Sequence, residues 1–170
     1  MGEMMQEIFA RRSIRKYLDK EVPDAVIKEI IRAGMAAPSS ENEQPWQFII
    51  INQRDLFYQI AEFDPYAKML KRCGGAVVVC GDLSLINAEG FWIQGCSAAT
   101  QNMLLQAVSL GVGAVWVGIY PTQELVDGVR KVLKLPEIIV PLSIVSLGYP
   151  AEMPEYADRY NESRIRYNSW

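Results

Sequence analysis

The stretch that decides the fold class runs from Glu89 to Pro121 and reads "EGFWIQGCSAATQNMLLQAVSLGVGAVWVGIYP". Up to Leu110 it is mostly apolar but is interrupted by glutamine and asparagine, which predicts a long buried helix and not a membrane span. The glycines of "GVG" are typical of a helix end followed by a turn. Ala114 to Ile119 then reads as a strand that Pro121 closes. A long helix leading directly into a buried strand indicates a sheet covered by helices.

The rest of the chain alternates in the same way. Strands are predicted at residues 48–51, 76–80, 114–119 and 142–147. Helices are predicted at residues 4–10, from 23 to the residue before Pro38, 55–70 with a break near Asp64-Pro65, 89–110 and 124–133. The apolar run 48–51 suits a strand buried on both faces. These patterns predict one domain over residues 1–170, of class α/β or α+β.

Composition excludes several functions. The net charge of −3 argues against a general nucleic-acid binder, which needs a basic surface. The chain has no histidine, which removes Ser-His-Asp and Cys-His catalysis and histidine metal ligation. Acidic residues show no metal-ligand spacing, so we expect no metal site.

Three cysteines, none in a CxxC pair, argue against a disulfide framework or a zinc site and favour the reducing cytoplasm. The first residues contain glutamates and no long apolar core, so we expect no signal peptide.

A basic cluster follows the first predicted helix in "RRSIRKY", which supplies Arg11, Arg12, Ser13, Arg15 and Lys16. Planar guanidinium groups suit phosphate because they donate paired, charge-assisted hydrogen bonds. The alternative interpretation is a solvated basic face at the end of a helix.

A second polar cluster, "PSSENEQPW", spans Pro38 to Trp46. Its residue types are those of an ordinary turn, which is one interpretation. The other is contact with a flat ring whose rim alternates hydrogen-bond donors and acceptors. Asn42 carries both a donor and an acceptor, and Ser39 and Ser40 add hydroxyl or backbone contacts.

The segment "GVGAVWVGIYP" is close to a dinucleotide fingerprint, but its glycine spacing is wrong. It also leads into a strand, whereas that fingerprint follows a strand and opens a helix. We therefore reject a Rossmann site. Trp116 fits a core position. Gly118, at the strand end, would let a backbone N–H approach a ring closely.

Taken in order, "RRSIR", "PSSENEQPW", a glutamine-rich helix ending in "LGVG", "VWVGIYP", "SLGYPAEMPEY" and a late arginine resemble the nitroreductase family of FMN-dependent oxidoreductases. The resemblance covers nearly the whole chain and is to the short members. It implies an α+β fold with a central mixed β-sheet of four to five strands flanked by helices. It also implies a homodimer with FMN at the interface, in which residues 150–170 form an exchanged arm.

The resemblance also implies roles for individual residues. The residues that match the phosphate and ribityl motif are Arg11, Arg12, Ser13 and Arg15, and Arg159 would complete the phosphate site. Arg15 is also the candidate to stabilise the reduced ring near N1 and O2. The loop laid against the ring by the partner subunit would contain Pro38, Ser39, Ser40 and Asn42. The backbone of Val117 and Gly118 would face flavin N5 and O4.

The implied activity is hydride transfer from NADH or NADPH through FMN to nitroaromatic, quinone or similar acceptors, in a ping-pong mechanism. No catalytic side chain is expected, since the flavin supplies the redox chemistry. Two alternatives stay open: a specialised flavin enzyme, such as a reductive dehalogenase or one that consumes flavin, and a flavin-binding protein without turnover. The short linkers argue against the lid that specialised members carry. The sequence leaves open the acceptor, the choice of nicotinamide nucleotide and any flavin contact within Asp55–Arg72.

Overall fold

The computed structural model describes residues 4–87 and 89–170, and its centre is a four-stranded sheet in the order β1-β2-β4-β3. The strands are β1 (Trp46–Ile51), β2 (Gly75–Asp82), β3 (Gly113–Gly118) and β4 (Ile139–Gly148). The α-helices are α1 (Met4–Ala10), α2 (Asp24–Met35), α3 (Arg54–Phe63), α4 (Phe91–Ser109) and α5 (Gln123–Leu133). Short 3₁₀ turns are η1 (Ser40–Asn42), η2 (Lys68–Arg72), η3 (Leu83–Leu85) and η4 (Glu162–Arg164).

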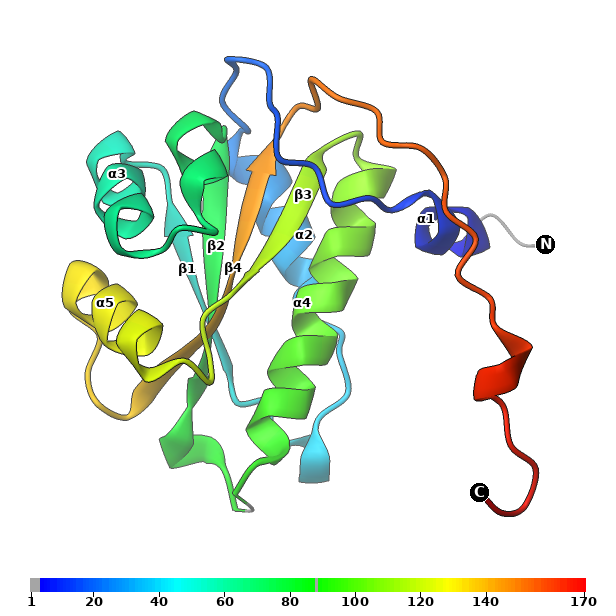
Figure 1. Cartoon of the computed structure of the whole chain (residues 1–170). Helices are drawn as coiled ribbons and strands as arrows, with labels where there is room; N and C mark the ends of the chain where they lie inside the picture. Colours follow the sequence, from blue (N-terminus) through cyan, green and yellow to red (C-terminus); the bar gives the residue numbers. More distant parts are fainter. Residues whose placement is uncertain (1–3, 88) are drawn as a thin grey trace.

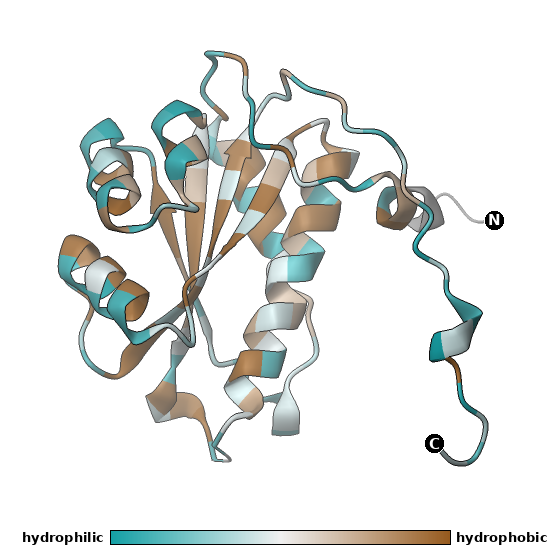
Figure 2. Ribbon diagram, viewed as in Figure 1, coloured by the Kyte–Doolittle hydropathy of each residue, from teal (hydrophilic) through white to brown (hydrophobic). Residues whose placement is uncertain are grey.

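Helices cover both faces of the sheet (Figure 1). The alternation of side chains along β2 shows how: Val77 and Val79 join the core cluster that includes α2 and α4. Val78 and Cys80 join the opposite cluster, with α3 and α5. Because successive strand residues point to opposite faces, one run of small apolar residues serves both cores. Figure 2 shows the strands as hydrophobic along most of their length.

Helix and strand positions follow the sequence-based prediction closely. The break expected near Asp64-Pro65 is present, because α3 ends at Phe63, Asp64 is extended, and the chain resumes in η2. The burial of β1 differs from the prediction. Residues 48–50 are only half-buried, because β1 lies at the edge of the sheet and has a neighbour on one side alone.

The expectation of a mixed sheet needs a correction within this chain. All three strand pairings are antiparallel. Among the described residues, parallel pairing occurs at one isolated bridge, between Ser13 and Ala114. Helix α3 therefore returns the chain from β1 to its antiparallel neighbour β2, whereas α4 carries it from β2 across to β3, which runs in the same direction on the far side of β4.

The C-terminal segment leaves the body of the molecule after an antiparallel bridge between Tyr17 and Pro150 (Figure 1). Its large apolar side chains stay in solvent: Met153 is 95% exposed and Trp170 is fully exposed. In the part of the chain that the structure describes, no helix has the length and apolar character needed to cross a membrane.

Tyr17 fastens the segment that follows α1 to the sheet. Its hydroxyl donates to the carbonyl oxygen of Ile14 at 2.6 Å and lies 3.0 Å from Oγ of Ser146. Its ring occupies the space beside Gly148, where a Cβ atom would come within 2.6 Å of ring carbon Cδ1. Burial raises the pKa of Tyr17 above its ordinary value, so the hydroxyl stays a donor at neutral pH.

We predict that Tyr17→Phe destabilises the fold. The change leaves the Ile14 carbonyl without its donor and the buried Ser146 hydroxyl without its Tyr17 partner, which costs about 1–3 kcal/mol in free energy of unfolding. Urea denaturation followed by fluorescence measures this, with Tyr66→Phe as control because Tyr66 is 80% exposed. Equal stability of the two variants would show that the Tyr17 hydroxyl does not anchor the segment.

Candidate functional site

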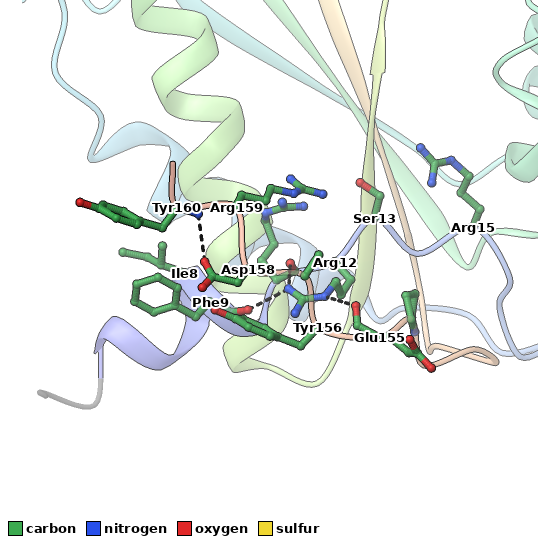
Figure 3. Close-up of a pocket in the computed structure, with 13 residues that line it drawn as sticks. Ile8, Phe9, Arg12, Ser13, Arg15, Glu155, Tyr156, Asp158, Arg159 and Tyr160 are labelled. Carbon is green, nitrogen blue, oxygen red and sulfur yellow. Dashed lines mark hydrogen bonds between the residues drawn. The ribbon is translucent and has the colours of Figure 1, made fainter. Parts of the chain in front are cut away.

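An arginine-lined cavity of about 630 Å³ lies between the segment after α1 and the C-terminal segment. This volume is within the range of small-ligand sites. The residues that line it are Ile8 and Phe9 from α1, Arg11, Arg12, Ser13 and Arg15 from the segment after α1, and residues 154–160 from the C-terminal segment. Figure 3 shows Arg159, Arg12 and Ser13 close together, with Arg15 further along the segment.

The first wall of the cavity is held by edge strand β3. Helix α1 ends at Ala10, and the chain then extends along β3, where the Ile14 N–H donates to the carbonyl of Ala114 at 3.0 Å. The Ile14 side chain packs on Gly113, where a Cβ atom would lie 2.8 Å from Ile14 Cγ2. Glycine is therefore required at this point of β3 for the segment to approach closely.

The second wall is held by a carboxylate. Oε1 of Glu152 accepts hydrogen bonds from the backbone N–H groups of Arg15, at 2.6 Å, and Lys16, at 3.0 Å. The hydrogen bond from the Arg15 backbone, followed by that from Lys16, lowers the pKa of Glu152 below its usual range. The Ala151 N–H adds a bond to the Lys16 carbonyl at 2.9 Å. The C-terminal segment thus departs from a fixed point beside the basic cluster.

The Arg12 side chain braces the cavity. Its guanidinium donates to the backbone carbonyls of Phe9 at 2.8 Å, Arg11 at 2.7 Å and Glu155 at 3.0 Å. It also lies over the ring of Tyr156, 5.2 Å from the centroid. The sequence suggested a phosphate contact for Arg12, but here its donors join α1 to the C-terminal segment.

Arg11 is the cation whose charge its surroundings disfavour, and Arg159 contributes to this effect. Burial lowers the pKa of the Arg11 guanidinium, and the positive charges of Arg159 and then Arg12 lower it further. Such a shift means that the charged form is destabilised by its surroundings, so a bound anion would relieve the repulsion. Asp158 lines the same cavity and its Oδ1 accepts the N–H of Tyr160 at 2.9 Å, but among the described residues it forms no ion pair with an arginine. The donor set therefore fits one phosphate group.

The far end of β3 offers an open backbone edge. The carbonyl of Ala114 points to that edge, and residues two apart along a strand share a direction, so Gly118 presents its N–H there as well. Val117 points its backbone toward β4 and its side chain into the core. No atom lies within 4 Å of a Cβ built on Gly118. Of the two residues predicted to face a ring, Gly118 has the available N–H.

The loop at residues 38–42 lies elsewhere in the same chain. It forms η1 beside the first turns of α4, where Gly95 packs on Ser39 (Figure 1). Ser39 Oγ accepts the N–H of Gln44 at 2.9 Å, and Asn42 Oδ1 accepts from the Gln44 side chain at 3.1 Å. Pro38, Ser39, Ser40 and Asn42 are absent from the lining of the arginine-lined cavity. The structure therefore brings Arg11, Arg12, Ser13, Arg15 and Arg159 together, and leaves the loop apart from them.

Sequence reasoning missed the rest of the second wall. Glu155, Tyr156 and Tyr160 line the cavity, whereas the sequence predicts a dimer arm over residues 150–170 with Arg159 as its one ligand contact. The signal available was the spacing of aromatic and acidic residues around Arg159 in "EYADRY".

These features define an α+β sandwich with an anion cavity beside the open edge of an antiparallel sheet. The Nitroreductase family model matches residues 8–75 and 86–149, and the chain belongs to this family.

Similar proteins agree with that assignment. A protein of Methanothermobacter thermautotrophicus, provisionally named an NADH dehydrogenase/NAD(P)H nitroreductase, is 45% identical over 99% of this chain and 88% of its own. A crystal structure from Parabacteroides distasonis with the same provisional name has a TM-score of 0.96 and 43% identity, covering 100% of both chains. A provisionally named nitroreductase from Desulfovibrio desulfuricans, solved in complex with FMN, has a TM-score of 0.87 and 28% identity, covering 100% of this chain and 99% of that one.

Proposed function

We propose that the protein is an FMN-dependent NAD(P)H oxidoreductase that reduces nitroaromatic, quinone or similar acceptors. The observation that carries the proposal is the arginine-lined cavity, in which Arg11 and Arg159 repel each other beside the open edge of β3. The family assignment and the names of the similar proteins support the same activity.

The residues present suit FMN in particular. Arg11, Arg159 and the hydroxyl of Ser13 would hold its single phosphate, whose charge is about −1.5 to −2 at neutral pH. The backbone N–H of Gly118 would meet the polar rim of the ring. Gly118 lies about 13 Å along β3 from Ala114, at ~3.3 Å per residue. Arg15 would favour a negative charge on the pyrimidine side. When bound, FMN supplies the acceptance and delivery of hydride, for which the chain has no redox side chain of its own.

We also propose that the working unit is a homodimer in the cytoplasm. The loop at residues 38–42 cannot reach the arginine-lined cavity of its own chain without rearrangement, so a second copy would supply it. The C-terminal segment supports this, since Tyr167 is 84% exposed and Trp170 fully exposed, and such side chains need a surface to cover them. Three free, buried cysteines support a reducing compartment.

The first prediction from this function concerns FMN affinity. Arg11→Ala or Arg159→Ala should raise the Kd for FMN roughly tenfold or more, because one charge-assisted hydrogen bond is worth about 1.5–3 kcal/mol. Fluorescence titration of the apoprotein measures the Kd. Arg32→Ala is the control, since Arg32 lies on α2, outside the lining of the cavity, and pairs with Glu29 at 3.8 Å. An unchanged Kd in both test variants would remove these arginines from the phosphate site.

The second prediction concerns assembly. Deleting residues 163–170 should weaken the dimer and lower FMN retention together, because the arm would help a second copy to complete each site. Sedimentation analysis at several concentrations, with flavin absorbance recorded on the same samples, measures both. A full-length monomer with full FMN occupancy would contradict the dimer proposal.

The third prediction concerns turnover. The glycine-rich segment 111–118 leads into β3 and does not open a helix, so it does not form a dinucleotide-binding turn that would hold the nucleotide apart from the flavin. The donor and the acceptor should therefore use one exposed ring face in turn. Varying NADH or NADPH against a nitroaromatic acceptor should give parallel double-reciprocal lines.

Anaerobic addition of each nucleotide to the purified yellow protein should first bleach the flavin absorbance. If neither NADH nor NADPH bleaches it, the oxidoreductase function is wrong. Intersecting lines together with a trapped ternary complex would contradict the proposal that donor and acceptor share one ring face. They would leave the oxidoreductase function standing.

A further inference from the structure

A second basic cavity, of about 660 Å³, shares no lining residue with the first. Its lining residues are Tyr17, Asp19, Arg54, Tyr58, Lys71 and Arg72. Arg15 lines the arginine-lined cavity and Tyr17 lines this one, so the two cavities flank the same short stretch of backbone. We call the second one the α3–η2 cavity, after the elements that supply its cations.

Positive charge dominates the α3–η2 cavity. Three cations face one carboxylate among its lining residues, a net charge of +2. Arg54 Nη2 lies 3.4 Å from Oδ1 of Asp19, whose side chain is 99% exposed, so water screens this pair and leaves the guanidinium available. Arg54 Nη1 also donates to the carbonyl of Lys71 at 3.3 Å, which ties α3 to η2 and holds the cations in one place.

An aromatic face stands beside these cations. The Lys71 ammonium lies 5.6 Å from the centroid of the Tyr58 ring, within the range of a cation–π contact. Tyr58 is 48% exposed, so part of its surface is open to a ligand. Clustered cations next to an exposed aromatic ring suit a ligand that joins phosphates to a flat base.

We propose that the α3–η2 cavity binds the adenosine-phosphate part of the nicotinamide nucleotide. This rests on the proposed function, in which the nicotinamide must reach the flavin beside the open edge of β3. The phosphates of the nicotinamide nucleotide then need cations outside the arginine-lined cavity, because the cations of that cavity would bind the FMN phosphate. Arg54 and Arg72 contact the phosphates, and the Tyr58 ring packs against adenine.

The test measures nucleotide binding directly, by calorimetric titration of the FMN-loaded protein with two unreactive fragments, ADP and adenosine 2′,5′-bisphosphate. Arg54→Ala and Arg72→Ala should each weaken binding roughly five- to tenfold, as expected for the loss of one partly exposed cation–phosphate contact. Arg72→Lys should restore part of the affinity, since it returns the charge without the fork. Arg32→Ala is the matched control and should bind as the wild type does.

The outcomes separate the possible contacts. Weaker binding of both fragments would assign the cavity to the 5′-phosphates that NADH and NADPH share. Weaker binding of the 2′,5′-bisphosphate alone would assign it to the 2′-phosphate and explain a preference for NADPH. Wild-type affinity for both fragments in both alanine variants would overturn the proposal, as would a wild-type protein that binds neither.

Flavin bleaching and donor KM, measured on the same variants, distinguish the proposed nucleotide site from the proposed oxidoreductase function. A wild type that binds the fragments while NADH and NADPH leave its flavin unbleached would refute the oxidoreductase function and retain the nucleotide site. A wild type that is bleached, with unchanged donor KM in both alanine variants, would refute the nucleotide site and retain the function.

Discussion

The extended segment between α1 and α2 depends on one set of contacts, and both cavities depend on the segment. The Tyr17 hydroxyl reaches the Ile14 carbonyl and Ser146, while the Ile14 N–H reaches Ala114 on β3. These bonds fix a stretch with no regular structure of its own onto the edge and face of a rigid sheet. Functional side chains are then presented from a defined backbone, as a binding site requires.

Charge decides what this scaffold can bind. In a chain of net charge −3, the arginines after α1 meet Arg159 in a cavity where burial and like charge destabilise Arg11. A local excess of cations in an acidic protein selects a small anionic ligand and not an extended polyanion. The α3–η2 cavity repeats this arrangement with a different set of cations, so the two proposed phosphate sites would flank one segment of backbone.

Local patterns in the sequence predicted most of the helices and strands. They could not predict which strands pair with one another. Helix α4 and strand β3 follow from apolar periodicity and the glycines between them, both of which are local properties. The order and direction of the strands depend on where each connecting segment delivers the next strand, and this leaves no mark in the strands themselves. The half-burial of residues 48–50 has the same origin, because an apolar run reads alike at an edge and at the centre of a sheet.

The candidate site was predictable in its residue types and less so in their use. "RRSIRKY" indicated a phosphate site, and four of its members do line the cavity with Arg159. The bracing role of Arg12 depends on carbonyls at Phe9 and Glu155, which no spacing in the sequence reveals. The separation of the loop at residues 38–42 from the cavity is likewise a property of the folded chain.

The two walls of the arginine-lined cavity also set an order of events during synthesis. The bond from Arg12 to Glu155 joins positions 143 residues apart, and all four strands lie between them in the sequence. The ribosome therefore produces the whole sheet before it adds the second wall. A nascent chain can build its sandwich while the arginine-lined cavity still lacks one side, so a ligand that needs both walls can be captured only after residues 154–160 have been made.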